Sequence, residues 1–145
     1  MIAKRGTKVS RFSVEFEVAN YDDVIEAKHG HLAPNKIRRT RIRGVVDTGA
    51  SRLVLPAAVA RQLGLPRGAK AKVRYADGRR TVRNTVKDVF VTMQGREETF
   101  TAVVEENRKD ALIGAIVLEA FDFLADCSAQ RLVPRDPDYV VSELE

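Results

Sequence analysis

Residues Gly44–Ser51 read GVVDTGAS, and this stretch decides the fold around which the rest of the chain is arranged. Val45 and Val46 are β-branched residues typical of a buried strand, so Asp47 is expected where a strand leaves the core. Gly49 lets the chain turn sharply and pack closely against a neighbouring segment. A carboxylate that is held by backbone on both sides and partly shielded from water is a group that can be tuned for chemistry. Asp47 is therefore the candidate catalytic residue.

A second motif lies downstream, where two apolar residues precede a glycine in Leu112-Ile113-Gly114 and a helix is expected to begin. Asp47-Thr48-Gly49-Ala50-Ser51, preceded by two valines and followed by this second motif, resembles the active-site signature of the retropepsin-like aspartic proteases. These enzymes are the single-lobed, homodimeric relatives of pepsin. The resemblance covers most of the chain, from about Ile37 to Pro134.

The resemblance implies a mainly β fold, a closed acid-protease barrel of a single lobe with two short helices. We expect one domain over residues 1–145, with a core at about 9–134 and a C-terminal tail at 135–145. A two-lobed pepsin-like chain would be about twice as long and would carry the motif twice, whereas this chain carries it once. The second aspartate must then come from a second chain, and a two-fold axis would pass between the two Asp47 side chains.

The activity that the resemblance implies is that of an aspartic endopeptidase, in which a water molecule activated by the Asp47 pair hydrolyses a peptide bond without metal or cofactor. In such a loop, Thr48 hydroxyls would bond across the two chains and Gly49 would allow the loops to approach, while Ser51 completes the turn. Ala50 has no hydroxyl with which to stabilise the carboxylates, so we expect a mildly acidic activity optimum. The alternative is a catalytically silent module that uses the same fold for binding or dimerisation.

Leu112, Ile113 and Gly114 are expected to support the active-site loop from behind. A hairpin is predicted at 73–82, because Asp-Gly between two strand-like segments is a strong hairpin signal. The family carries its flap at this place, and such a flap closes over the substrate and excludes water. The alternative is an ordinary sheet edge, in which Tyr75 packs on Arg80 instead of covering the site. The candidate flap and substrate-binding residues are Tyr75, Ala76, Asp77, Gly78 and Arg79.

The remaining elements follow from hydrophobic periodicity and turn residues. Residues 21–35 are expected to form a surface loop with one helical turn near 24–28. Pro56 fits the first position of a helix, and Gly64 its end. The strand at 12–18 and the segment Tyr139–Val141 are candidates for a dimer sheet. Further strands are expected at 37–46, 53–55, 86–93, 98–104, 111–113, 123–126 and 131–133, and helices at 57–63 and 115–121.

Composition limits the other classes of function. The net charge is +5, and the densest basic run is Ile37–Arg43. We interpret this run as a solvated strand face and do not expect nucleic acid as a partner, because no zinc-finger spacing or phosphate-binding loop accompanies it. No apolar run reaches the roughly 18 residues of a membrane span. No secretory signal is expected at the start, and the single Cys127 cannot form an internal disulfide, so a cytoplasmic location is expected.

Two further groups of residues are set aside. His29 and His31 lie two residues apart but lack further ligands at a recognised spacing, so no metal site is expected. Cys127 has no histidine partner identifiable from the sequence and is expected to be a spectator thiol.

Overall fold

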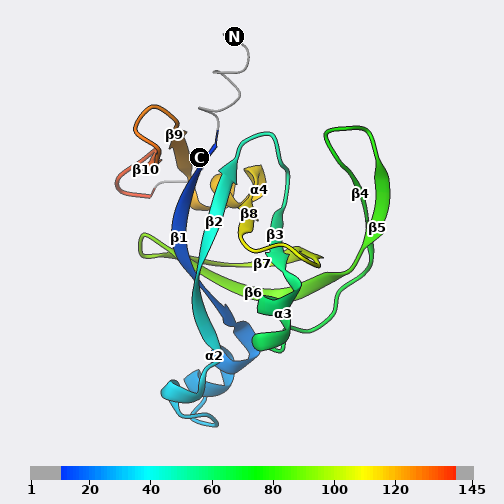
Figure 1. Ribbon diagram of the computed structural model, residues 1–145. Helices are drawn as coiled ribbons and strands as arrows, with labels where there is room; N and C mark the ends of the chain where they lie inside the picture. Colours follow the sequence, from blue (N-terminus) through cyan, green and yellow to red (C-terminus); the bar gives the residue numbers. More distant parts are fainter. Residues whose placement is uncertain (1–10, 140–145) are drawn as a thin grey trace, which may run out of the picture.

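The computed structural model describes residues 11–139, which form a closed six-stranded barrel with short helices packed around it (Figure 1). The strand order around the barrel is β1-β2-β8-β3-β7-β6, and the pairs β4–β5 and β9–β10 form separate two-stranded sheets. The strands are β1 (Arg11–Asn20), β2 (Arg39–Asp47), β3 (Leu53–Pro56), β4 (Ala71–Arg74), β5 (Arg80–Arg83), β6 (Thr85–Met93), β7 (Arg96–Glu105), β8 (Ala111–Ile113), β9 (Phe123–Asp126) and β10 (Arg131–Pro134). The helices are α2 (Tyr21–Lys28), the 3-10 turn η1 (Pro34–Lys36), α3 (Ala57–Gln62) and α4 (Ala115–Phe121).

Side-chain alternation along the strands fills one core inside the barrel. In β1, Phe12, Phe16 and Val18 are buried, whereas Ser13 and Glu15 face solvent. Burial of such large apolar side chains is the main favourable contribution to folding. The largest fully buried side chains are Phe16, Phe121, Leu53, Leu55, Leu63 and Ile113. The prediction of a mainly β closed barrel is confirmed.

The helix count differs from the expectation of two. The segment expected to form a loop with one helical turn begins instead with α2, which starts directly at Tyr21. Asn20 caps this helix, because its side-chain oxygen accepts a hydrogen bond of 3.1 Å from the Asp23 N–H. The side-chain nitrogen of Asn20 also donates to the Leu63 carbonyl at 2.9 Å, and the residue is buried. Capping and burial at Asn20 thus stabilise a helix that hydrophobic periodicity alone does not indicate.

Pro56 also differs from its expected place. It is the last residue of β3 and precedes α3, with a ψ of 138° that keeps it extended. Pro56 stays extended because β3 is still paired with β7 at this point, where Pro56 lies opposite Glu105. Gly64 follows α3 with a φ of +60°, as a glycine at a helix end is expected to do.

The basic run forms an exposed strand face. Arg39 and Arg41 of β2 approach Glu17 and Glu15 of β1 at 3.6 Å and 3.4 Å. Exposed pairs of this kind contribute little to stability, but they keep the strand soluble. The interpretation of this run as a solvated face therefore agrees with the structure.

No helix in the described range 11–139 is both long enough and apolar enough to cross a bilayer. The predicted segment Tyr139–Val141 falls mainly outside the described residues. Tyr139 itself is not in a strand, and its hydroxyl donates to the Ala120 carbonyl at 3.1 Å.

β8 lies between the two strands that flank the Asp47 loop. It pairs in parallel with β2, placing Val46 beside Ile113, and antiparallel with β3, placing Leu53 beside the same residue. The chain therefore leaves β2, turns through residues 48–52 and returns as β3 on the far side of β8. The loop is held at both ends by one central strand.

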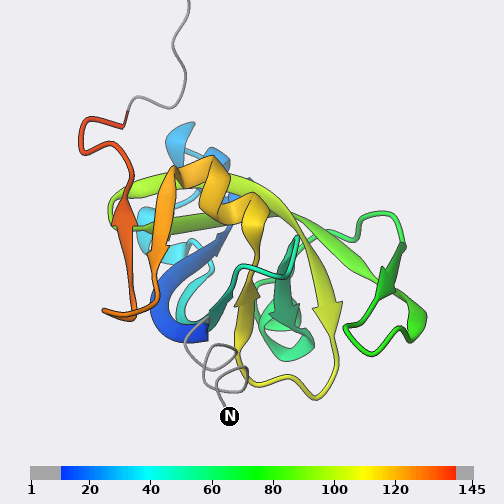
Figure 2. The same cartoon turned by 90° about the horizontal axis from the view of Figure 1, so that it is seen from above.

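The first turn of α4 binds the same loop from behind. Figure 2 shows α4 continuing directly from β8. Its first N–H groups have no partner inside the helix, and those of Ala115 and Ile116 donate to the carbonyls of Ala50 and Ser51 at 2.8 Å and 3.0 Å. A Cβ on Gly114 would lie 2.5 Å from the Arg52 carbonyl oxygen and 2.7 Å from the Arg52 nitrogen. Only glycine leaves room for this contact.

We predict that Gly114→Ala displaces the loop and lowers the free energy of unfolding by about 1–3 kcal/mol, because the added methyl meets backbone that cannot move freely. Urea unfolding measures the loss. Amide hydrogen exchange provides a local readout, since the N–H groups of Ala115 and Ile116 should exchange faster in the variant. Unchanged exchange at both amides would contradict the close packing.

Asp23 and Arg38 form the polar contact that joins α2 to the start of β2. The Arg38 N–H, Nε and one terminal nitrogen donate to the Asp23 carboxylate at 2.9, 2.8 and 3.0 Å. The hydrogen bonds from the Arg38 side chain hold the pKa of Asp23 below its ordinary value of 3.8. A carboxyl whose pKa is lowered by folding adds stability above its unfolded pKa, and this contribution is lost as the pH falls through the folded pKa.

We predict that Asp23→Asn lowers the free energy of unfolding by about 1–3 kcal/mol at pH 7. Its stability should also fall less than that of the native chain between pH 7 and pH 3, because the titrating carboxylate is gone. Urea unfolding at both pH values measures this, with Asp22→Asn as the control, since Asp22 is an exposed acid in the same first turn. If the free energy of unfolding fell equally between pH 7 and pH 3 in the Asp23 and Asp22 variants, the stabilising role of the Asp23–Arg38 pair would be contradicted.

Candidate active site

Asp47 is the last residue of β2 and has a fixed orientation. Its side chain is 16% exposed. One carboxylate oxygen, Oδ1, accepts a hydrogen bond of 3.0 Å from the Gly49 N–H, and Oδ2 lies 3.0 Å from a terminal nitrogen of Arg11. The Ala50 N–H closes the turn by donating to the Asp47 carbonyl at 3.1 Å. The loop thus presents one partly buried carboxylate in a single orientation.

Gly49 occupies the turn without the special backbone conformation that its sequence position suggested. Its φ is not in the left-handed region, and a Cβ there would meet only Asp47 Oδ1, at 3.4 Å. The residue at which close packing excludes a side chain is Gly114, which lies behind the loop. The sharp turn is made by hydrogen bonds to Asp47 and by α4, not by glycine flexibility.

The structure places the other predicted loop residues as follows. Thr48 is exposed beside Asp47, as is Ser51 further along, and neither side chain makes a hydrogen bond within residues 11–139. Ala50 is half-buried. The roles predicted for these three residues depend on a second chain and stay predictions. Leu112 and Ile113 pair with the strands on either side of the loop, and their supporting role stays a prediction.

The predicted hairpin is present and stands away from the barrel wall (Figure 1). Residues 75–79 form its turn, in which Gly78 has a φ of +87° and donates its N–H to the Tyr75 carbonyl at 2.9 Å. The Tyr75 N–H donates to the Arg79 carbonyl at 2.8 Å, and Asp77 accepts from the Arg79 N–H at 2.9 Å. Ala76 is exposed in the turn. The role of this hairpin as a flap stays a prediction.

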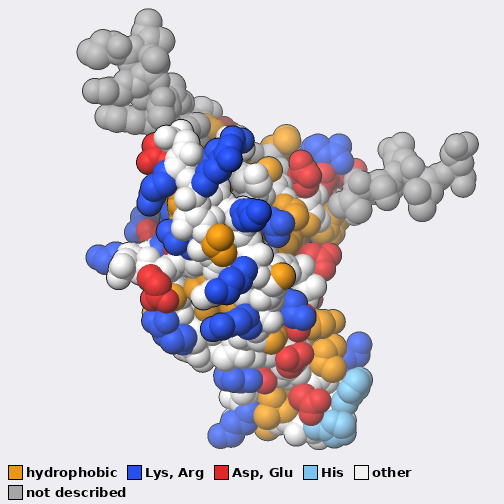
Figure 3. Space-filling view, turned by 90° about the vertical axis from the view of Figure 1, so that its right-hand side faces the viewer, with side chains coloured by type: hydrophobic (Ala, Val, Ile, Leu, Met, Phe, Trp, Pro, Cys, Tyr) orange, Lys and Arg blue, Asp and Glu red, His pale blue; other side chains and the backbone are white. Residues whose placement is uncertain are grey.

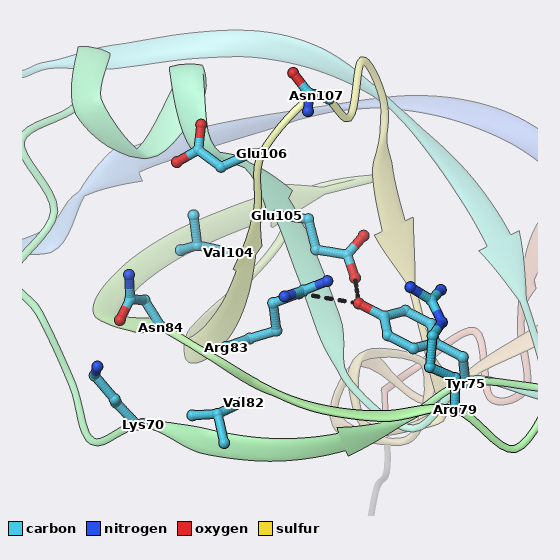
Figure 4. Close-up of a pocket in the computed structure, with 10 residues that line it drawn as sticks. All are labelled: Lys70, Tyr75, Arg79, Val82, Arg83, Asn84, Val104, Glu105, Glu106 and Asn107. Atoms are coloured by element: carbon cyan, nitrogen blue, oxygen red, sulfur yellow. Dashed lines mark hydrogen bonds between the residues drawn. The ribbon is translucent and has the colours of Figure 1, made fainter.

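Tyr75 joins the hairpin to the barrel in a network that sequence reasoning missed (Figure 4). Its hydroxyl donates to Glu105 Oε2 at 2.7 Å and accepts from Arg83 Nε at 3.0 Å. Its ring lies under the Arg79 guanidinium, 4.4 Å from the ring centre, whereas the sequence suggested Arg80 as the partner. Arg108 donates to the other oxygen of Glu105 at 2.9 Å. Glu105 is thirty residues from Tyr75, so no local pattern could have identified the pair.

Burial and hydrogen bonding act in opposite directions on Glu105. Burial raises the pKa of this carboxyl, but the hydrogen bonds from Tyr75 and Arg108 outweigh burial and leave the pKa below its ordinary value. Glu105 is therefore an anion at neutral pH. It holds the hairpin against the end of β7.

The histidines and the cysteine discussed above have few polar partners among residues 11–139. No group of three or more His, Cys, Asp or Glu side chains within 11–139 could hold a metal ion. His31 lies 3.4 Å from Glu26, and both are exposed. Cys127 is half-buried and packs against the core, and its thiol donates a hydrogen bond of 3.9 Å to the Ala125 carbonyl.

Two comparisons with known proteins found matches to this chain. Residues 33–120 match the sequence model of the family described as "gag-polyprotein putative aspartyl protease". No curated protein matches the chain. Among solved structures, the EIAV protease complexed with the inhibitor HBY-793 is similar, with 22% sequence identity and a TM-score of 0.46. That match covers 65% of this chain and 83% of the EIAV protease chain. Because the family match extends over more than half of the residues, this chain belongs to the retropepsin-like gag-polyprotein aspartyl protease family.

Proposed function

We propose that this chain is an aspartic endopeptidase whose active site forms when two copies meet at Asp47. The observation that carries the proposal is the fixed, partly buried carboxylate of Asp47, held by the Gly49 N–H in a loop that β8 and α4 support. Each chain has one such motif. Homodimerisation on a two-fold axis would bring the second aspartate opposite the first.

The chemistry follows from two carboxylates that share one proton. At a separation of about 3 Å both cannot ionise at low cost, so one stays protonated. The ionised carboxylate takes a proton from a bound water, and the protonated one donates to the carbonyl oxygen of the peptide bond. The water oxygen attacks the carbonyl carbon, and the proton roles then reverse as the amine leaves. Polypeptide is the substrate, and we propose a mildly acidic optimum and a cytoplasmic location, the latter supported by the single cysteine.

We predict that Asp47→Asn abolishes peptide cleavage, lowering kcat/KM by at least about a thousandfold, because an amide cannot act as the base. A peptide-library assay read by mass spectrometry measures it. Asp22→Asn, which removes an exposed acid far along the chain, is the control and should cleave as the native chain does. Equal residual activity in the native chain and the Asp47 variant would favour a catalytically silent binding module instead.

Arg11 competes with the dyad in the single chain. Asp47 Oδ1 accepts a hydrogen bond from Gly49, and the Arg11 guanidinium forms an ion pair with the other oxygen, Oδ2. The carboxylate of a second chain would have to displace this guanidinium. The pair is mostly exposed on the arginine side, and such pairs contribute about 0.2–1 kcal/mol.

We therefore predict that Arg11→Gln raises activity about two- to fivefold at concentrations where the dimer is incompletely formed. Arg41→Gln, which removes an exposed arginine from the neighbouring strand and changes the net charge equally, is the matched control. Initial rates against a fixed peptide, together with dimer affinity from sedimentation, measure the effect. A loss of activity in the Arg11 variant with unchanged dimer affinity would contradict the competition.

A further inference from the structure

A cavity of about 490 Å³ lies between the β4–β5 hairpin and the end of β7 (Figure 4). The hairpin contributes Tyr75, Arg79 and Arg83 to its lining, with Lys70 just before β4, and β7 contributes Glu105. The hydrogen bonds of Tyr75 to Glu105 and Arg83 close one side. The cavity is therefore a built space between two elements held together by a polar network.

The hairpin around this cavity carries a strong excess of positive charge. Six of the fourteen residues from Lys70 to Arg83 are Lys or Arg, and only Asp77 is acidic. In Figure 3, Lys and Arg side chains gather over the face of the molecule that carries the hairpin. The six cations divide into two sets. Lys70, Arg79 and Arg83 line the cavity, whereas Lys72, Arg74 and Arg80 do not.

The acids at the cavity leave Lys70 and Arg79 largely unpaired, whereas Arg83 is linked through the Tyr75 hydroxyl to Glu105. Glu105 is bonded to Arg108 and Tyr75, and Glu106 lies 3.4 Å from Arg61, which is outside the cavity. Lys70 makes no hydrogen bond or ion pair among the described residues. Arg79 approaches Asp77 only at 3.8 Å, with both side chains more than 60% exposed. An incoming carboxylate would thus find cationic donors available.

The cavity also lies within reach of a peptide bound at Asp47. β3 begins just after the active-site loop and runs parallel to β7, so Pro56 at its far end pairs with Glu105. Three strand spacings across the sheet and four residues along it place Glu105 about 20 Å from Asp47. An extended peptide of about six residues covers this distance.

We infer that the cavity recognises an acidic side chain of the substrate, within about six residues of the bond that is cleaved. The inference rests on the proposed peptidase function, and it assigns Lys70, Arg79 and Arg83 as specificity-determining residues. Charge-assisted hydrogen bonds from lysine or arginine to a carboxylate are among the stronger polar contacts in proteins. A glutamate at the matching position should therefore be preferred over glutamine.

A peptide side chain fits this cavity better than a nucleic-acid backbone. Glu105 and Glu106 line it together with the cations and would repel a continuous row of phosphates. Tyr75 has its ring covered by Arg79, so it does not present a free face on which a base could stack.

The test compares two variants of equal charge. Lys70→Gln/Arg79→Gln/Arg83→Gln removes the cavity cations, and Lys72→Gln/Arg74→Gln/Arg80→Gln removes those that do not line it. Cleavage of paired peptides that differ only by Glu or Gln at one position gives the preference. We expect about a tenfold Glu preference in the native chain and the second variant, and its loss in the first. Equal effects of the two variants would overturn the inference, because general electrostatic attraction would then explain the preference.

Binding to the uncleaving Asp47→Asn chain separates this inference from the proposed function. Fluorescence anisotropy with the Glu and Gln peptides measures affinity without turnover. Glu preference in binding with no cleavage by the native chain would support the cavity and reject the peptidase. Cleavage by the native chain with no Glu preference in either assay would reject the cavity alone. A single-stranded oligonucleotide could also be added to the bound Glu peptide. If it bound more tightly and displaced the peptide from Lys70, Arg79 and Arg83, the inference of an acidic peptide ligand would be overturned.

Lys70→Glu provides a variant that keeps the hydrogen bonds of the hairpin network, since Lys70 forms no hydrogen bond or ion pair with Tyr75 or Glu105 in the described residues. The reversed charge should lower cleavage of the Glu peptide and raise that of a Lys peptide, inverting the preference. An unchanged preference in this variant, with normal thermal stability, would remove Lys70 from the assignment and contradict the inference.

Discussion

The hydrogen bonds from the first turn of α4 to the carbonyls of Ala50 and Ser51 are the contact on which the site depends. The first N–H groups of a helix lack partners inside the helix, and the carbonyls of a sharp loop lack partners inside the loop. The helix N–H groups therefore bond to the loop carbonyls, and both sets are satisfied. Gly114 permits the approach, because a side chain there would collide with Arg52 backbone. β8 then fixes the loop laterally by pairing with the strand before it and the strand after it. A rigid loop is what a catalytic carboxylate requires, since small displacements cost large factors in rate.

The rest of the proposed function follows from having one such loop in each chain. Both oxygens of Asp47 are engaged within the chain, one by the Gly49 N–H and one by Arg11. Of these, only the exposed Arg11 can be exchanged at low cost. A second copy would supply the missing carboxylate, and the hairpin held by Tyr75 and Glu105 would supply the wall of the cleft. Dimer assembly is thus assigned to the exchange of Arg11, chemistry to Asp47, and substrate selection to the β4–β5 hairpin.

Sequence reasoning predicted the strands from hydrophobic periodicity and turn residues such as Asp77-Gly78, and the barrel from the family resemblance that Asp47–Ser51 and Leu112–Gly114 carry. It identified the Asp47 loop and Leu112–Gly114, because short motifs with fixed chemistry are visible in one sequence. It missed α2, whose start depends on an Asn20 cap that contacts Leu63, a residue distant in the chain. It missed the bond between Tyr75 and Glu105 for the same reason. Long-range polar contacts leave no periodic signal, and the predicted division into a core and a tail stays a prediction.

Turnover should require two chains, and a dilution series tests this requirement. Sedimentation and initial rates would be measured on the same samples across the dimer–monomer transition. We expect activity per chain to fall in step with the dimer fraction, and excess Asp47→Asn chain to lower it further by forming mixed dimers. Constant activity per chain in samples that contain only monomer would contradict it.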